Sequence, residues 1–186
     1  MTAPLHVLLV RHARTLLNAE GRLRGLANPE LDEVGIEQAH ATARALVPQH
    51  ITRVLSSPLN RAVTTAEIIA SESGVTNDVD PAFNDRDYGP WTGHIKADVI
   101  KEWGSVDAAP GVEESSVVLA RALPALNALA EGADSGVIAI VSHDATIRPI
   151  LQSIQPGIEA EVENGSWAEL SWDGQGWKVL SVDNTA

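Results

Sequence analysis

The sequence contains no cysteine, and it has only one methionine, one phenylalanine and one tyrosine among 186 residues. Without cysteine, disulfide bonds, thiolate nucleophiles and cysteine-bound zinc are excluded. No apolar run approaches the roughly 18 residues that a membrane-spanning helix needs, and the first residues lack the basic start of a signal peptide. We therefore expect a cytoplasmic protein without a membrane partner.

Positive charge is also scarce, since 13 basic residues stand against 25 acidic ones and the net charge is −12. Nucleic acid is therefore not expected as a partner, because its recognition needs a basic face. The charge is uneven: residues 1–61 hold seven arginines and five acidic residues, whereas residues 62–186 hold six basic and 20 acidic ones. Because arginine suits oxyanion recognition, this distribution suggests a small anionic ligand in a pocket, with randomly spread surface charge as the alternative.

Strand-like and helix-like segments alternate along the chain, which predicts one α/β domain over residues 1–186. The predicted architecture is a three-layer α/β/α sandwich with a mainly parallel central sheet. We expect strands at residues 5–11, 53–56 and 137–141, and a hairpin of residues 167–172 and 177–182. Helices are expected at 36–47, 58–71 (with Ser57 as N-cap), 95–103, 114–131 (kinked at Pro124) and 144–154. Residues 74–93 are expected to form a long irregular connection.

Two of the predicted strands run directly into a histidine, in VRHART around His12 and in VSHDAT around His143. In a parallel sheet both histidines would emerge at the carboxyl edge, where open α/β sheets bind ligands. Phosphoryl transfer to an imidazole needs cations around the phosphoryl oxygens, an acid for the leaving oxygen and a base for water. Candidates for these roles are Arg11, Arg61, and an aspartate at position 85 or 87 of the long connection.

Four segments resemble the motifs of the histidine phosphatase superfamily, the phosphoglycerate mutase-like proteins of branch 1. LLVRHARTLLNAEGRLRG is similar to the Arg-His-Gly signature with its downstream Thr, Asn and Arg-x-x-Gly. SSPLNRAVTTAE resembles the Ser-Pro-x-x-Arg-Ala helix start, NDRDYGPWTGH the acid-bearing loop, and VSHDATIRPIL the Ser-His segment. The four occur in the family's order between residues 5 and 152, and ENGSWAEL resembles the strand that closes such domains.

The resemblance implies a role for each matching residue. His12 would be the nucleophile that forms a phosphohistidine, and Asp85 would be the general acid and then the base. No metal or other cofactor is implied. Arg11, Arg61 and His143 would surround the phosphoryl group, and Asn18, Arg24 and Ala145 would contribute to substrate binding.

The sequence departs from the family pattern at several of these positions. Ala13 replaces the glycine that follows the nucleophile, so it needs an ordinary backbone conformation or a local rearrangement. Asp85 replaces a glutamate, and it would need burial or a nearby anion to be protonated often enough; Asp87 is the competing acid. Arg24 stands where a neutral polar residue is common, and it either contacts a second anionic group or is a surface charge.

The sequence favours a phosphatase acting on small phosphomonoesters over two other functions. A phosphoglycerate mutase of this family is typically longer, and a weakly active phospho-ligand binding protein would not require a nucleophile. A protein phosphatase with an open site is a further alternative. The natural substrate and the oligomeric state, a homodimer included, are not readable from the sequence.

Two further residues have open roles. Arg148 either forms a structural ion pair or contacts the ligand, and Trp91 is a candidate for the pocket wall.

Overall fold

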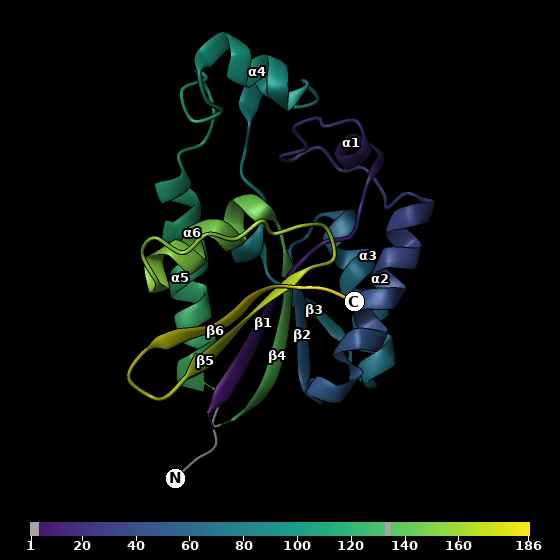
Figure 1. The fold of residues 1–186 in the computed structure, drawn as a ribbon. Coiled ribbons are helices and arrows are strands. Elements are labelled where there is room, and N and C mark those ends of the chain that lie inside the picture. The colour runs from purple at the N-terminus through teal and green to yellow at the C-terminus, as the bar shows by residue number, and fades with distance from the viewer. Residues whose placement is uncertain (1–3, 133–134) are drawn as a thin grey trace.

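A six-stranded sheet of order β3-β2-β4-β1-β5-β6 forms the centre of the computed structural model, which describes residues 4–132 and 135–186 (Figure 1). The four strands β3, β2, β4 and β1 are parallel, while β5 runs antiparallel to β1 and β6 antiparallel to β5. The predicted mainly parallel sheet is thus confirmed. The strands are β1 (Leu5–Arg11), β2 (Arg53–Ser56), β3 (Asn77–Val79), β4 (Gly136–Ser142), β5 (Trp167–Trp172) and β6 (Trp177–Asn184).

Helices cover both faces of this sheet, as alternate residues of β1 demonstrate. Val7 and Leu9 belong to one buried cluster, which includes side chains of α5 and α6. Leu8 and Val10 belong to a second cluster on the opposite face, with side chains of α2 and α3. Figure 1 shows these two helix pairs on either side of the sheet. The helices are α1 (Leu16–Ala19), α2 (Glu33–Leu46), α3 (Asn60–Ser73), α4 (Lys96–Trp103), α5 (Ser115–Gly132) and α6 (Asp144–Ile154).

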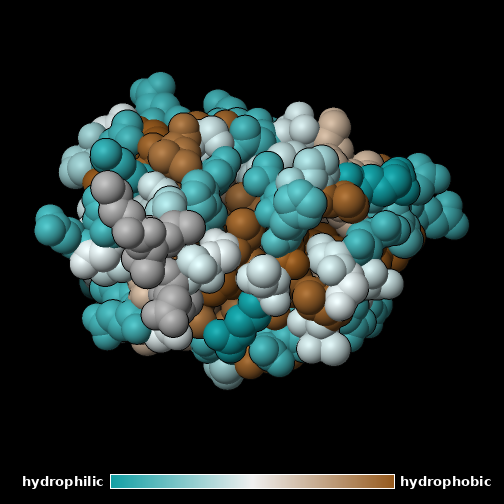
Figure 2. All heavy atoms as spheres, turned by 90° about the horizontal axis from the view of Figure 1, so that it is seen from below, coloured by the Kyte–Doolittle hydropathy of each residue, from teal (hydrophilic) through white to brown (hydrophobic). Residues whose placement is uncertain are grey.

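A third, smaller cluster of buried side chains lies beyond the carboxyl edge of the parallel strands, around α4 at the top of Figure 1. It joins Leu23 from the segment after β1 to Tyr88, Val99 and Ala109. The opposite end of the molecule, seen in Figure 2, carries small hydrophobic areas scattered among hydrophilic side chains. None of the helices in the described ranges combines the length and hydropathy that crossing a bilayer requires.

Two predicted helix starts were wrong. Ser57 is not the N-cap of α3, which begins at Asn60 after the N-cap Leu59, because the Ser57 hydroxyl accepts from the Leu59 N–H (3.3 Å) rather than from an N–H of the first helical turn, and it also contacts His143. Helix α2 begins at Glu33 rather than after Gly35, because the Asp32 side chain accepts a hydrogen bond from the Gly35 N–H (2.7 Å) and caps the helix.

Other boundaries differ in smaller ways. Residues 74–93 include β3 and two short 3-10 turns rather than being wholly irregular. Helix α5 continues through Pro124. The remaining predicted strands and helices agree with the structure to within about two residues.

Candidate active site

The pairing of β1 with β4 brings the two histidines together. Arg11 is opposite Ser142 in the parallel register, so the residues that follow them, His12 and His143, leave the sheet side by side. Their ring centroids are 5.1 Å apart, and both side chains are fully buried. Sequence reasoning placed both histidines at this edge, and the structure agrees.

The hydrogen bonds of His12 leave one ring nitrogen free. Its Nδ1 lies 2.7 Å from the carbonyl oxygen of Ala13, and because a carbonyl can only accept, Nδ1 must carry the proton. The lone pair is then on Nε2, which is buried and has no hydrogen-bond partner among the described residues. Burial lowers the pKa of His12 well below its usual value, and the neighbouring His143 and Arg61 lower it further. The imidazole is therefore neutral at physiological pH.

Ala13, which replaces the glycine of the family motif, is accommodated without strain. It is fully buried and does not adopt a positive φ. Its N–H donates to Thr65 Oγ1 (3.1 Å) on α3. On its other side, the Asn164 side chain donates to the carbonyl oxygen of His12 (3.0 Å). The backbone of His12 and Ala13 is therefore held by two segments that are distant in the sequence.

Arg61 lies at the start of α3 and is completely buried. Its two terminal nitrogens donate to the carbonyl oxygens of Ala27 (2.7 Å) and Gly25 (2.8 Å), and one of them also donates to Asp85 Oδ2 (2.8 Å). Its Nε has no hydrogen-bond partner in the described part of the chain. The guanidinium group thus ties the segment after β1 to the acid-bearing loop, and it still has a free donor.

Asp85 is the aspartate that the fold brings into the site. Burial raises the pKa of its carboxyl to about 6, against the opposing effect of Arg61. Oδ1 accepts from the Arg86 N–H (2.8 Å), and Oδ2 lies 3.5 Å from His143 Nδ1. Asp87 is exposed instead, and its Oδ1 accepts from the Gly89 N–H (2.8 Å). Geometry therefore favours Asp85 over Asp87 as an acid near the histidines.

Arg11 is oriented by an unusual backbone conformation. One of its terminal nitrogens donates to the carbonyl oxygen of Val162 (2.6 Å), while its Nε has no partner. Val162 has a φ of 50°, a value that β-branched residues rarely adopt. Its N–H donates to Asp183 Oδ1 (2.8 Å) at the end of β6. The sheet edge therefore holds the carbonyl that orients Arg11.

His143 precedes α6 and contacts a serine that sequence reasoning assigned elsewhere. Its Nε2 lies 2.8 Å from Ser57 Oγ, while its Nδ1 is buried without a hydrogen-bond partner. Burial lowers the pKa of His143 well below its usual value, with Arg61 contributing next. A neutral imidazole that receives the Ser57 hydroxyl proton at Nε2 carries its own proton on Nδ1, which faces the site.

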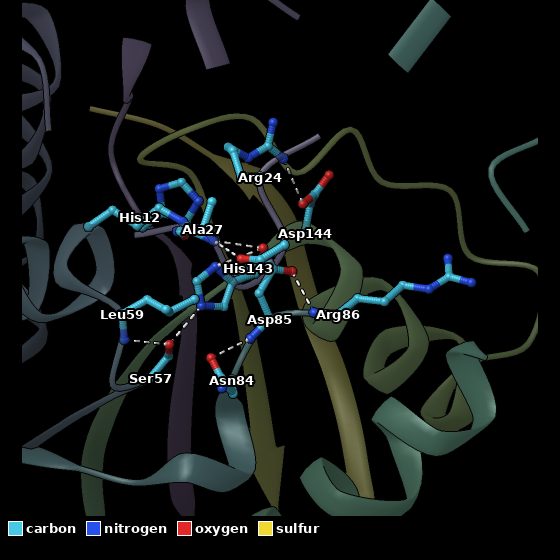
Figure 3. A network of polar contacts seen from close by, with 12 residues as sticks. His12, Arg24, Ala27, Ser57, Leu59, Asn84, Asp85, Arg86, His143 and Asp144 are labelled. Carbon is cyan, nitrogen blue, oxygen red and sulfur yellow. Dashed lines mark hydrogen bonds and ion pairs between the residues drawn. The ribbon is translucent and has the colours of Figure 1, made fainter. Parts of the chain in front are cut away.

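Arg24 lies in the site rather than on the surface, as Figure 3 shows. Its Nη2 is 3.5 Å from Asp144 Oδ1, and Nη1 donates to the carbonyl oxygen of Arg22 (3.0 Å). Burial would raise the pKa of Asp144, but Arg11 and Arg24 reverse this and hold it below its usual value. A cation and a carboxylate therefore stand together beside the histidines.

The two remaining predicted binding residues occupy different positions. The Asn18 side-chain oxygen accepts from the N–H and the hydroxyl of Thr15 (both 2.9 Å) in a capping box that begins α1. Its amide nitrogen is not used in these bonds. Ala145 lies in the first turn of α6, where N–H groups have no helical acceptor. The structure connects neither residue directly to His12.

Several residues of the site were missed by sequence reasoning. Ser57 was taken for a helix cap, and Thr65 and Asn164 lie in the quoted segments SSPLNRAVTTAE and ENGSWAEL but were given no role. Asp144 is adjacent to His143 in the motif, so its position was a readable signal. Arg121 on α5 donates to the carbonyl oxygens of Asn84 and Asp85 (3.2 and 2.7 Å), a contact that only the fold reveals.

Other predicted features lie outside the histidine cluster. Among the described residues Arg148 forms neither an ion pair nor a contact with the site, since its guanidinium donates to the carbonyl oxygens of Ala160 and Glu161. Trp91 packs in the α4 cluster and donates to the carbonyl oxygen of Pro110 (2.9 Å).

Asp85 lines an open cavity of about 600 Å³. Within the described chain no three His, Asp or Glu side chains are grouped to hold a metal. The other residues of this cavity are Leu26, Pro81, Asn84, Asp87, Gly111, Val112, Glu113 and Arg121.

Comparison with known proteins identifies the family. Residues 7–185 match the model of the histidine phosphatase superfamily, branch 1. The chain is 30% identical to "Probable phosphoglycerate mutase GpmB" of Yersinia pestis, over 98% of this chain and 94% of that protein.

Two solved structures share the fold. A mycobacterial glucosyl-3-phosphoglycerate phosphatase superposes with a TM-score of 0.87 at 24% identity, covering 97% of this chain and all of that one. A phosphoglycerate mutase from Bacillus anthracis gives a TM-score of 0.89 at 20% identity, covering 98% and 94%. The family match over almost the whole sequence, together with paired buried histidines among arginines, leads to one conclusion: the chain belongs to branch 1 of the histidine phosphatase superfamily.

Proposed function

We propose that this protein hydrolyses small phosphomonoesters through a phosphohistidine at His12, with Asp85 as general acid and base. The observation that carries the proposal is the free, buried Nε2 of His12. A neutral imidazole with its lone pair held among arginines is prepared to attack an electron-poor phosphorus. The free Nε donors of Arg11 and Arg61 supply positive charge for the phosphoryl oxygens, so the proposal needs no metal ion.

In the first step, His12 Nε2 attacks phosphorus as the bond to the ester oxygen breaks. Asp85 gives its proton to the departing oxygen, so a neutral alcohol leaves. A carboxyl with a pKa of about 6 is protonated in about a tenth of molecules at pH 7, and a bound phosphate dianion raises that fraction by charge repulsion. Arg11, Arg61 and His143 hold the phosphoryl oxygens during the transfer.

In the second step, water attacks the phosphohistidine. Asp85, now ionised, takes the proton from this water, and His12 leaves as a neutral imidazole. Inorganic phosphate is released, and the proton taken from water returns Asp85 to the protonated form in which it began. The same carboxyl thus serves as acid and then as base, which its position within 3.5 Å of His143 and beside Arg61 supports.

Phosphoglycerate mutase activity is the second candidate, and the name of the 30%-identical Yersinia relative favours it. A mutase returns the phosphoryl group from histidine to a second position of the substrate instead of to water. The open cavity that Asp85 lines favours hydrolysis, because it leaves room for water next to the buried acid-base group. A weakly active phospho-ligand binding protein would contain the same arginines but show no turnover.

The decisive experiment assays the protein in EDTA against an aryl phosphate and a panel of metabolite phosphates between about pH 4.5 and 8. His12→Ala and Asp85→Asn are compared with His40→Ala, which changes an exposed histidine on α2. We expect turnover in wild type and His40→Ala, none in His12→Ala, and a loss in Asp85→Asn that is largest for poor leaving groups.

A rapid quench at alkaline pH followed by intact-mass measurement should detect phosphorylated His12. Transfer of phosphate between glycerate positions without release would support the mutase instead. Phosphate binding without turnover of any ester would leave the binding protein and contradict the proposal.

A further inference from the structure

The buried polar atoms of this site that lack a hydrogen-bond partner among the described residues include both nitrogens and a carboxylate oxygen. Within the described residues, seven buried side-chain nitrogen or oxygen atoms lack a hydrogen-bond partner, and six of them belong to the site. Five of these six are nitrogens, as an anion site requires. The sixth is Oδ1 of Asp144, and an ionised carboxylate oxygen only accepts hydrogen bonds. It does not complement a phosphoryl oxygen, whereas a donor on another part of the ligand would complement it.

Arg24 and Asp144 form an incomplete pair. The distance of 3.5 Å from Arg24 Nη2 to Asp144 Oδ1 is long for a hydrogen bond. Arg24 Nε also has no partner. The two side chains are only 10% and 15% exposed, so neither satisfies its free atom by turning into bulk water. The pair therefore presents one unused donor and one unused acceptor at the same place.

The charges of this pair oppose each other. Arg11 and Arg24 hold the pKa of Asp144 below its usual value, so the carboxylate is ionised at neutral pH. A second anionic group attracted by Arg24 would also meet the negative charge of Asp144 at close range, and most of the attraction would be cancelled. A hydroxyl group is neutral, and it can accept from Arg24 while donating to Asp144.

The pair is also close to the position of the leaving alcohol. Asp144 directly follows His143, and its charge contributes to the raised pKa of Asp85. In Figure 3 Arg24 and Asp144 lie on one side of His143, and Ser57 lies on the other. Because Asp144 and Arg24 both influence the pKa of Asp85, an alcohol whose oxygen is protonated by Asp85 would extend from the phosphoryl group within reach of these two side chains.

Building on the proposed hydrolysis, we propose that Arg24 and Asp144 select phosphomonoesters whose alcohol carries a further hydroxyl group, and that they disfavour esters whose alcohol carries a carboxylate. The substrate class is then the phosphates of sugars and other polyols rather than of hydroxy acids. Arg24 acts as half of a neutral recognition pair and not as the binding site of a second anion.

Three esters that differ in the groups on their alcohol test this selection: glycerol 3-phosphate, 3-phosphoglycerate and propyl phosphate. The first two differ only in a hydroxymethyl group against a carboxylate, and the third lacks hydroxyls. We expect the wild-type kcat/KM for glycerol 3-phosphate to exceed both others by at least about tenfold, because unpaired buried polar groups penalise an analogue that cannot bond them. An equal or higher value for 3-phosphoglycerate would overturn the proposal.

Two variants should move the ratio of glycerol 3-phosphate to 3-phosphoglycerate in opposite directions. Asp144→Asn removes the repelling charge, so the ratio should fall about tenfold through a gain for 3-phosphoglycerate. Arg24→Gln leaves the carboxylate unbalanced, so the ratio should rise. Asp173→Asn, at the exposed turn near the other end of β1, should leave the ratio unchanged. Because the two shifts are opposite, reduced stability of one variant does not decide the outcome.

The failures of the two proposals are distinguishable. Turnover that depends on His12, with a ratio unaffected by both Asp144→Asn and Arg24→Gln, overturns the selection and leaves hydrolysis standing. A ratio that responds to Asp87→Asn instead would place the alcohol in the open cavity beside Asp85 and also overturn the selection. No turnover of any ester would overturn the hydrolysis and the selection with it.

Discussion

Arg61 and Asp85 form a 2.8 Å hydrogen bond between side chains that are 0% and 1% exposed. The arginine comes from the start of α3 and the aspartate from the loop after β3, so the bond joins two separate segments. A buried ion pair is strongly destabilised when one partner is removed, because the other charge remains uncompensated. The bond therefore links the stability of the fold to the chemistry of the site.

Arg61→Lys tests the need for the guanidinium group. A lysine cannot reach two carbonyl oxygens and a carboxylate with one planar group, so we expect kcat on an aryl phosphate to fall about 10²–10³-fold. Arg44→Lys, on the exposed part of α2, is the matched control and should retain wild-type activity. If Arg61→Lys retained more than half of the wild-type kcat, the need for the planar guanidinium group would be contradicted.

The pH dependence of kcat/KM should reveal Asp85. Its pKa is raised to about 6, and the acid is active when protonated. For esters with poor leaving groups, kcat/KM should therefore decrease as the pH rises through about 6, since this parameter reports the free enzyme. An aryl phosphate needs less proton donation, so its decrease should be weaker. In Asp85→Asn this decrease should disappear, and its persistence would point to another group.

Ser57→Ala should impair the enzyme through His143. Removing the hydroxyl leaves His143 Nε2 buried without its partner at 2.8 Å, at a cost of about 1–3 kcal/mol in the free energy of unfolding. The proton of His143 is then free to move to Nε2, away from the phosphoryl group. We expect kcat to fall by about tenfold or more with a smaller change in KM, whereas the exposed Ser71→Ala on α3 serves as the unaffected control.

Gly35→Ala should be strongly destabilising. A Cβ at this position would lie 2.0 Å from the carbonyl oxygen of Arg14, which follows the nucleophile by two residues. Overpacking against backbone typically costs about 1–3 kcal/mol and occasionally more, and we expect at least about 3 kcal/mol in urea denaturation. Gly132→Ala meets no atom within 4 Å and should change stability little. Similar stability of the two variants would contradict the close approach of α2.

Local patterns were sufficient to predict most of the fold. Nearly continuous apolar runs at β1 and β4 identify buried parallel strands, since both faces of such strands are covered. The helix starts were less readable, because a cap depends on which side chain reaches a backbone N–H. Asp32 does so at α2, whereas the Ser57 hydroxyl accepts from the Leu59 N–H, ahead of the first turn of α3, and also contacts His143.

The sequence by itself determined the family, the mainly parallel sheet and the two histidines at its carboxyl edge, because motifs and periodicity are local properties of the chain. Only the tertiary structure decided that Arg24 is buried against Asp144, that Ser57 and Asn164 contact the histidine segments, and that Asp85 rather than Asp87 meets Arg61. These contacts join residues distant in the sequence. Their burial and charge environments arise only when separate elements pack together, and no local pattern records that.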